Sequence, residues 1–380
     1  MKKHESLLLQ TLKAGMGYGE LPECENWNGL FEFSKKHSLA NLFYNAVKDS
    51  ERVPAEVKNK AKQHFLANTA QQISQEYYAS EMFSRFEEAG IKYSPLKGYV
   101  LRKLYPAPEL RISCDVDVFY DETRKKDVYA IMQELGFENE GDSVNHGEWM
   151  KEAVTIETHH QLAAQNDLYH DYYEGIWDRL KTKNGSLYEF SDEDFYIYFF
   201  VHAAKHFAHG GFGVRTVLDV YVYTHNKTLD RAYLDTEFEK IKLKKFVQTI
   251  ENLSEVWFGE RQTDEDSELL GEYIFGSGTY GLSSNNAVIN NVNEGKSVKK
   301  TKISYFFKTI FPSYKIMKSH YPILKKLPFL LPFAWIVKWF AVLFKRRERF
   351  GVVVRNVKSV DEKKIDKAAR ILELTEIPMD

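Results

Sequence analysis

Residues 94–120 have the sequence SPLKGYVLRKLYPAPELRISCDVDVFY. In the last ten of these residues apolar and polar side chains alternate, a pattern typical of a β-strand with one buried face. The stretch before them starts with a short extended piece ending at Lys97-Gly98. One or two helical turns over 99–105 follow, and then two prolines that force a loop. The sequence therefore predicts a strand, a short helix, a loop and a second strand within a mixed α/β unit.

Two aspartates share the polar face of the predicted second strand. Side chains at positions i and i+2 leave the same face, so Asp115 and Asp117 project together at a spacing of ~7 Å. Neighbouring acids repel each other, whereas Mg²⁺ is usually held by one or two carboxylates together with substrate phosphates. Glu157 lies on the polar face of the next predicted strand (153–162), with His159 beside it, and could complete a site for two metal ions. A solvated strand face is the alternative interpretation of these acids.

The spacing of apolar residues along the rest of the chain predicts an α+β fold in four parts. The predicted parts are an N-terminal helical region (1–90), a small mixed-sheet α/β core (91–170), a helical domain (171–290) and a basic, aromatic-rich C-terminal segment (291–380). Asn26 or Asn28 is expected to cap an early helix, and Ala89-Gly90 to close a long one.

The composition excludes several classes of protein. The chain has 380 residues, 43% of them hydrophobic, with 52 Lys and Arg against 54 Asp and Glu, which excludes a disordered chain. Two cysteines, Cys24 and Cys114, cannot form a disulfide framework or a four-thiolate metal site. Cys114 points away from Asp115 in the predicted strand and is expected in the core. The apolar run near Met1 is too short for a signal peptide, so we expect a cytoplasmic protein.

Several blocks of the sequence resemble a known family. The stretch over 94–120 is similar to the signature of nucleotidyltransferases of the DNA polymerase β superfamily. It resembles more closely a bacterial family of uncharacterised nucleotidyltransferases. That superfamily has a Gly-Ser loop where this chain has Lys97-Gly98, which matches the Leu-Lys-Gly form of the closer family. The resemblance also covers FFVHAAKHFAHGGFGVRTVLDV (199–220) and spans most of residues 27–225.

The resemblance implies an Mg²⁺-dependent enzyme, with two ions bound together with nucleotide, that moves a nucleoside monophosphate from an NTP such as ATP to a hydroxyl acceptor. The acceptor could be a small molecule, a sugar or a protein. Residues 91–170 would be the nucleotidyltransferase core. The implied site residues are the metal ligands Asp115, Asp117 and Glu157, the last also activating the acceptor hydroxyl, and the phosphate-binding residues Lys97, Gly98 and Arg111.

The block over 199–220 leaves several interpretations open. The resemblance places a helical domain along the nucleotide cleft, so Lys205, His206 and Arg215 are expected to face phosphate or acceptor. Alternatively, Asp219 pairs with Arg215 or with a histidine and only packs the helices together. A metal hydrolase built from His202, His206 and Asp219 is a further alternative, although HAAKH lacks the glutamate of a metallopeptidase helix. A catalytically silent nucleotide-binding or regulatory module on the same fold also remains open.

The C-terminal segment differs in charge from the rest of the chain. Residues 296–349 contain fourteen Lys and Arg against one acid. Within it LPFLLPFAWIVKWFAVLF (327–344) is interrupted by Lys338 and two prolines, which disfavours a membrane-spanning helix. Either this helix packs into the core of the helical domain or it gives weak, peripheral contact with an anionic membrane surface. Residues 91–290 show no basic stripe, so we expect no specific nucleic-acid partner.

Overall fold

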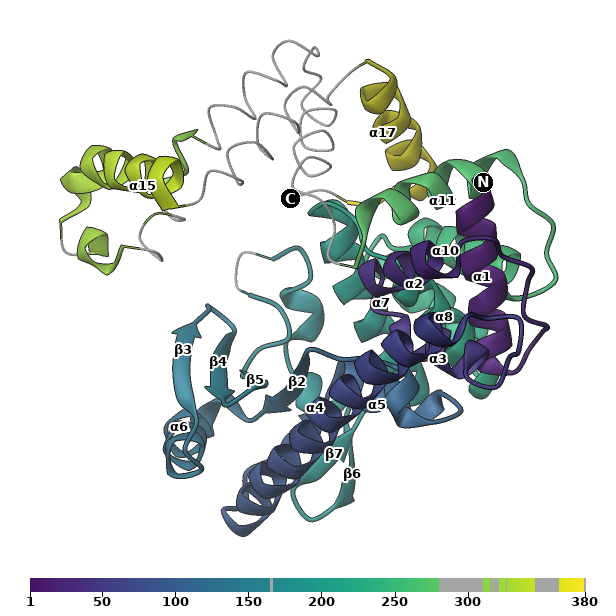
Figure 1. Ribbon diagram of the computed structural model, residues 1–380. Helices are drawn as coiled ribbons and strands as arrows, with labels where there is room; N and C mark the ends of the chain where they lie inside the picture. Colours follow the sequence, from purple (N-terminus) through teal and green to yellow (C-terminus); the bar gives the residue numbers. More distant parts are fainter. Residues whose placement is uncertain are drawn as a thin grey trace.

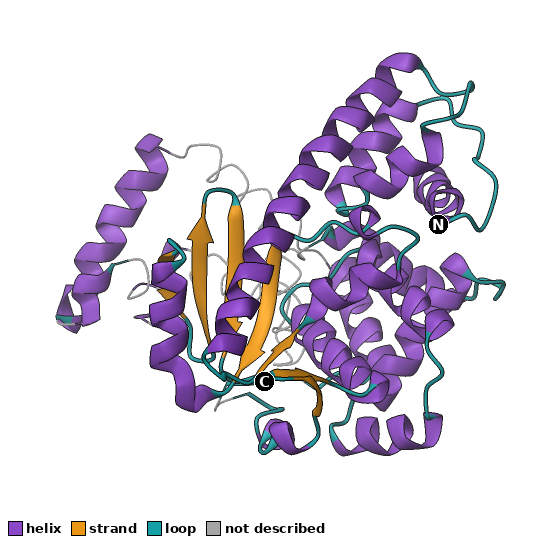
Figure 2. Ribbon diagram, turned by 90° about the horizontal axis from the view of Figure 1, so that it is seen from below, coloured by secondary structure: helices purple, strands orange, loops and turns teal. Residues whose placement is uncertain are grey.

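The computed structural model describes residues 1–164, 167–279, 310–314, 317, 321–325, 327–345 and 362–378. The fold is α+β, as the sequence predicts, with a mixed sheet lying beside a larger helical part (Figures 1 and 2). The long helix α4 joins the two parts, because it runs from the N-terminal helices to one face of the sheet (Figure 1).

The described residues form a sheet of seven strands in the order β3-β4-β5-β2-β1-β7-β6. The strands are β1 (Tyr93–Pro95), β2 (Asp115–Tyr120), β3 (Glu138–Asp142), β4 (His146–Lys151), β5 (Val154–His159), β6 (Lys181–Asn184) and β7 (Leu187–Glu189). β2 pairs in parallel with β5 and antiparallel with β1. It is therefore a central strand, held by hydrogen bonds on both sides.

The described residues also form thirteen α-helices. They are α1 (Lys3–Met16), α2 (Trp27–Lys36), α3 (Ala40–Val47), α4 (Ala55–Glu88), α5 (Lys97–Leu101), α6 (Lys125–Glu134), α7 (Asp192–Ala208), α8 (Val214–Asn226), α9 (Arg231–Lys240), α10 (Lys244–Phe258), α11 (Glu265–Ser277), α15 (Leu331–Lys345) and α17 (Glu362–Thr375). The division of the chain into four domains stays a prediction.

Two helix ends lie where the sequence predicts them. The side chain of Asn26 caps α2 by accepting a hydrogen bond from the backbone N–H of Gly29 at 2.8 Å. Gly90 follows the end of α4 with a φ of 63°, in the left-handed region that glycine adopts without strain. Both caps are set by local sequence, which is why periodicity and residue type suffice to find them.

The central strands have one apolar face and one polar face. Val116, Val118 and Ile156 are buried in a core shared with α4 and α6, where they join Met82 and Phe86. Each such side chain contributes ~1.5–3 kcal/mol when it is removed from water. A one-residue slip would expose all of them and bury the acids, so this core fixes the register of β2 and β5.

The structure corrects the predicted strands. β2 begins at Asp115 rather than at position 111. The hairpin of β3 and β4, which the sequence did not predict, extends the sheet beyond β5. The hairpin of β6 and β7 lies in a region predicted to be helical and pairs with β1. β3 and β6 are exposed along their whole length, so they lack the apolar face on which the prediction depends.

Cys114 is exposed, and the prediction that it lies in the core is wrong. Alternation fixes the direction of a side chain only within a strand, and Cys114 comes immediately before β2. It lies at the wall of the cavity described below.

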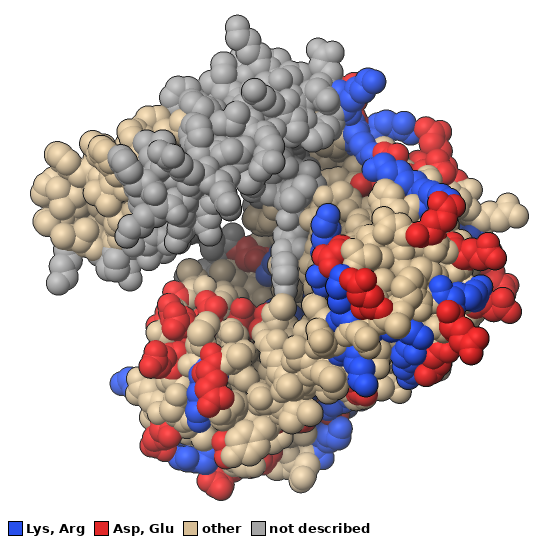
Figure 3. All heavy atoms as spheres, in the orientation of Figure 1, with Lys and Arg blue, Asp and Glu red and all other residues tan. Residues whose placement is uncertain are grey.

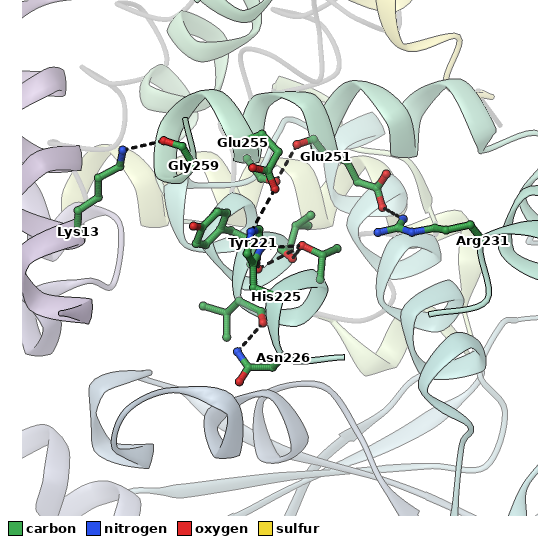
Figure 4. A network of polar contacts seen from close by, with 12 residues as sticks. Lys13, Tyr221, His225, Asn226, Arg231, Glu251, Glu255 and Gly259 are labelled. Atoms are coloured by element: carbon green, nitrogen blue, oxygen red, sulfur yellow. Dashed lines mark hydrogen bonds and ion pairs between the residues drawn. The ribbon is translucent and has the colours of Figure 1, made fainter. Parts of the chain in front are cut away.

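One large apolar core joins the N-terminal helices to the helices from α7 to α11. Polar contacts link the same helices at the surface (Figure 4). Glu251 of α10 pairs with Arg231 of α9 at 2.7 Å, and Lys13 of α1 donates to the carbonyl of Gly259 at 3.1 Å. Exposed ion pairs contribute little free energy each. Burial of the shared apolar core is therefore the main contribution to the free energy that holds these helices together.

The two described C-terminal helices have different surroundings. α17 packs against α10 and α11, and Ala368 and Ile371 join the large core. α15 buries Ala334 in a small separate cluster, and the indoles of Trp335 and Trp339 donate to backbone carbonyls at 3.0 and 2.7 Å. Within the described residues, α15 does not complete the core of the helical domain, so that interpretation of 327–344 is wrong there.

The exposed side of α15 is apolar. Phe333, Ile336, Val337 and Phe340 recur at helical spacing and are all exposed. No described helix combines the length and the apolar character needed to cross a bilayer. Most basic residues of 296–349 lie outside the described residues, so contact with an anionic membrane surface stays a prediction.

We expect the buried His37 to make the protein less stable in mild acid. Burial, and then the charge of Lys36, lower the pKa of His37 to about 4. In the unfolded chain His37 binds a proton below its ordinary pKa of ~6.5. The free energy of unfolding should therefore fall between these two values, by up to ~3 kcal/mol, and level off below the lower one. Thermal unfolding of wild type and His37→Phe across this pH range measures it. A stability difference between the two proteins that does not change with pH would contradict the prediction.

Candidate active site

The register of the sheet brings the three predicted carboxylates onto one face. Asp117 lies directly opposite Glu157 in the parallel pair of β2 and β5, and Asp115 lies two residues earlier on the same face of β2. Neighbouring strands are only ~4.8 Å apart, so the carboxylates share a small volume. Asp117 is buried, whereas Asp115 and Glu157 are half-buried. All three border one cavity.

Lys97 and His159 contact Asp117. The Nζ of Lys97 donates to Oδ1 of Asp117 at 2.7 Å. Nε2 of His159 lies 3.0 Å from the same oxygen and 3.2 Å from Oε2 of Glu157. Lys97 has a φ of 39°, which is unfavourable for a residue with a side chain. His159, which the sequence placed beside Glu157, thus bridges two of the three carboxylates.

The electrostatic environments of the two aspartates differ. Burial would raise the pKa of Asp117, but the charge of Lys97 and the hydrogen bond with His159 outweigh it and hold that pKa below its usual range. Burial, and then the charge of Asp117, raise the pKa of Asp115 to about 6. Burial would lower the pKa of His159, but its hydrogen bonds to Asp117 and Glu157 raise it. Mutual repulsion of the carboxylates therefore favours the binding of cations here.

The donor set fits divalent cations. The carboxylate of Asp115 accepts no hydrogen bond from any residue that the structure describes. Asp117 and Glu157 share the single Nε2 of His159. Carboxylate oxygens are the ligands that Mg²⁺ prefers, and one or two of them are usually enough when a nucleotide supplies the rest. Asp115, Asp117 and Glu157 therefore suit the predicted metal-binding role.

His146 belongs to this site and was not found from the sequence. β4 pairs antiparallel with β5, so His146 lies opposite His159, with ring centroids 4.9 Å apart. Donor atoms of His146, Glu157 and His159 all lie within 4.8 Å of one another. The alternation of polar and apolar residues over 146–149 is the signal that could have revealed the strand and the side of it that carries His146.

A cavity of about 370 Å³ lies over this face of the sheet and is bordered by α5, α7 and α8. Its size is within the range of sites for small molecules. Five predicted basic residues line it: Lys97, Arg111, Lys205, His206 and Arg215. A smaller cavity of about 170 Å³ between α1 and α11 contains no group of metal ligands among the described residues.

Two of the basic residues on the helices already have protein partners. The Nζ of Lys205 pairs with Oδ2 of Asp167 at 2.7 Å. Nη1 of Arg215 donates to the backbone carbonyl of Ile112 at 2.6 Å. Arg215 therefore fixes the segment that leads into β2. Contact of these residues with phosphate or acceptor stays a prediction.

The histidine pair of α7 does not form the zinc site that the sequence left open. Nε2 atoms of His202 and His206 are 2.9 Å apart, as expected for positions i and i+4 on one helix face. Burial, and then the charge of Lys97, lower the pKa of His202 well below its ordinary value. Asp219 is engaged elsewhere, and within the described residues these three side chains form no ligand group.

Asp219 forms a buried ion pair with Arg111, so the predicted pairing with Arg215 or a histidine is wrong. Nε and Nη2 of Arg111 donate to the two carboxylate oxygens of Asp219 at 2.7 and 2.8 Å. The hydroxyl of Tyr105 adds a third hydrogen bond at 2.8 Å, and Nη1 of Arg111 donates to Oγ of Ser113 at 3.2 Å. Arg111 therefore holds the loop before β2 while it also borders the cavity, and its contact with phosphate stays a prediction.

Side chains of α4 hold the same loop from the other side. Gln72 and Gln75 donate to the backbone carbonyls of Arg111 and Ser113 at 2.7 and 3.2 Å. Arg215 of α8 donates to the carbonyl of Ile112, which lies between these two residues. The three contacts together satisfy backbone carbonyls that a neighbouring strand would otherwise pair. They explain why β2 begins at Asp115 and not earlier.

Close packing explains the glycine at position 98. A Cβ there would lie 2.0 Å from Oγ of Ser113 and 2.9 Å from Nη1 of Arg111. We expect Gly98→Ala to lower the free energy of unfolding by ~1–3 kcal/mol, because overpacking shifts this buried contact. Denaturant unfolding measures it. The double variant Gly98→Ala/Ser113→Ala should recover part of the loss, and a double variant no more stable than the single one would contradict this explanation.

Charges of both signs are interspersed over the face of the molecule seen in Figure 3. Lys and Arg side chains lie beside Asp and Glu there, without a continuous basic stripe on that face. A duplex-binding surface requires clustered Lys and Arg along one side. The expectation of no specific nucleic-acid partner stays a prediction.

Residues 23–259 match the sequence profile of a family described as uncharacterised nucleotidyltransferase. The matched range includes the whole sheet, the three carboxylates and the helices α7 and α8 that border the cavity. No curated protein and no solved structure matches the chain.

Proposed function

We propose, from the premise that this chain belongs to the family of uncharacterised nucleotidyltransferases, that it transfers a nucleoside monophosphate from an NTP to a hydroxyl acceptor. Pyrophosphate would be the second product. One observation carries the proposal: Asp117 lies opposite Glu157, with Asp115 on the same face, beside a cavity lined by basic side chains. The acceptor is a small molecule, a sugar or a protein side chain.

The three carboxylates would hold two Mg²⁺ ions. Such ions, when bound, lower the pKa of the acceptor hydroxyl and neutralise charge on the transferred phosphoryl group and on pyrophosphate. The side chain of Glu157 is 22% exposed, so it can reach an acceptor and take the proton of its hydroxyl. The acceptor oxygen forms a bond to the α-phosphorus as the bond to the bridging oxygen breaks. Pyrophosphate leaves with that electron pair.

The basic residues of the cavity would bind the triphosphate. Lys205, His206 and Arg215 approach it from the helical side, and Lys97 from the sheet side. Lys97 shares Oδ1 of Asp117 with His159. With Mg²⁺ held by Asp117, the ammonium group of Lys97 would instead donate to a phosphate oxygen.

Incubation of the full chain with each labelled NTP and Mg²⁺, with and without cell extract, tests the proposal. Transfer of label to protein or to a small molecule, with release of pyrophosphate, is the expected result. Tight NTP binding in calorimetry without pyrophosphate release would instead favour the catalytically silent module. Absence of both binding and transfer would contradict both functions.

A further inference from the structure

We propose that a dication of a first-row transition metal binds between His146, Glu157 and His159, and that it binds there more tightly than Mg²⁺ does. This metal site lies within the proposed active site. A role for the bound ion in catalysis rests on the proposed function. Donor atoms of the three residues lie within 4.8 Å of one another. Donors of one ion bound at ~2.0–2.2 Å lie ~3–3.5 Å apart, so a small closure of His146 would complete the site.

The sheet sets this arrangement. Glu157 and His159 are two residues apart on β5 and therefore leave the same face. His146 faces His159 across the pair of β4 and β5, and its ring is inclined by 38° to that of His159. All three belong to strands, and a site on strands keeps its geometry better than a site on loops.

Hydrogen bonds orient both imidazole rings. Nδ1 of His146 lies 3.2 Å from Oδ1 of Asn145, which leaves Nε2 to bind an ion. Nε2 of His159 points at Oδ1 of Asp117 and Oε2 of Glu157, at 3.0 and 3.2 Å. An ion placed among these oxygens would displace the proton of Nε2 to solvent and take that nitrogen as a ligand.

The donor types select the class of ion. Mg²⁺ prefers oxygen ligands and retains several waters, whereas imidazole nitrogen suits zinc, iron, nickel and copper. Two histidines and one carboxylate also leave coordination positions open to water or substrate. The neighbouring Asp115 and Asp117 remain available for a second ion held by oxygen alone.

Titration of metal-free full chain with Co²⁺, followed by visible absorption and calorimetry without nucleotide, tests the inference. Wild type should bind Co²⁺ in the presence of excess Mg²⁺. His146→Gln should weaken binding at least ~10-fold while the thermal unfolding temperature stays close to that of wild type. His146→Cys should retain binding and add a near-ultraviolet band from sulfur bound to cobalt, which identifies residue 146 as a ligand.

The matched control is His206→Gln, because His206 and His202 offer a second histidine pair in the same cavity. This variant should bind Co²⁺ as wild type does. Loss of binding in His206→Gln but not in His146→Gln would overturn the inference, and so would displacement of Co²⁺ by Mg²⁺. No nucleotide is present, so a chain that fails to transfer label can still bind the ion here. Conversely, a chain without this site can still transfer label with Mg²⁺.

Discussion

Replacing Asp117 by asparagine is expected to lower the kcat/KM of nucleotidyl transfer about 10³-fold or more. Asp117 is buried, it lies opposite Glu157, and one of its oxygens already contacts both Lys97 and His159. Loss of its charge would remove one of the proposed metal ligands. Metal ions contribute several kcal/mol to phosphoryl transfer, where each 1.36 kcal/mol is tenfold in rate. Pyrophosphate release at saturating and limiting NTP measures the effect.

Glu138→Gln is the matched control for Asp117→Asn. Glu138 is an exposed acid on β3 of the same sheet, away from the cavity. The Glu138→Gln variant should keep the wild-type rate of transfer, because Glu138 borders neither the carboxylates nor the basic residues of the cavity. Circular dichroism of both variants checks that they are folded. A rate for Asp117→Asn within threefold of wild type would rule out the carboxylates as the catalytic centre.

The second large effect is expected from the buried ion pair of Arg111 and Asp219. Arg111 and Asp219 are 6% and 3% exposed, and two hydrogen bonds join them. Asp219→Leu should lower the free energy of unfolding by ~3–5 kcal/mol, because it leaves a buried guanidinium without its counter-charge. Denaturant unfolding measures the change.

The double variant Arg111→Met/Asp219→Leu should recover much of this loss. Replacing both partners of a buried ion pair by apolar side chains of similar size is often neutral, whereas removing one partner is strongly unfavourable. Tyr105→Phe removes only the third hydrogen bond to Asp219 and should cost less, ~1.5–3 kcal/mol. A double variant as unstable as Asp219→Leu would show that the pair stabilises the fold through contacts other than their mutual charge.

The sequence by itself determined the central strand and its acids. Alternation from Asp115 onward indicated which side chains share a face, and Glu157 fell on the matching face of a second strand. Residue types at Asn26 and Gly90 indicated helix ends for the same reason: each depends on neighbours within a few positions. Such short-range patterns do not depend on how the rest of the chain folds.

Only the tertiary structure decided which distant residues complete the site. Arg111 and Asp219 pair across 108 positions of sequence, so no local pattern could join them. Arg111 therefore holds the loop before β2 as well as bordering the cavity. His146 meets His159 only because two strands pair in one register. Cys114 is exposed because side chains from flanking helices, not a neighbouring strand, hold the backbone before it. Periodicity fixes the face on which a residue lies, but pairing between segments, driven by burial of their apolar faces, decides what stands opposite.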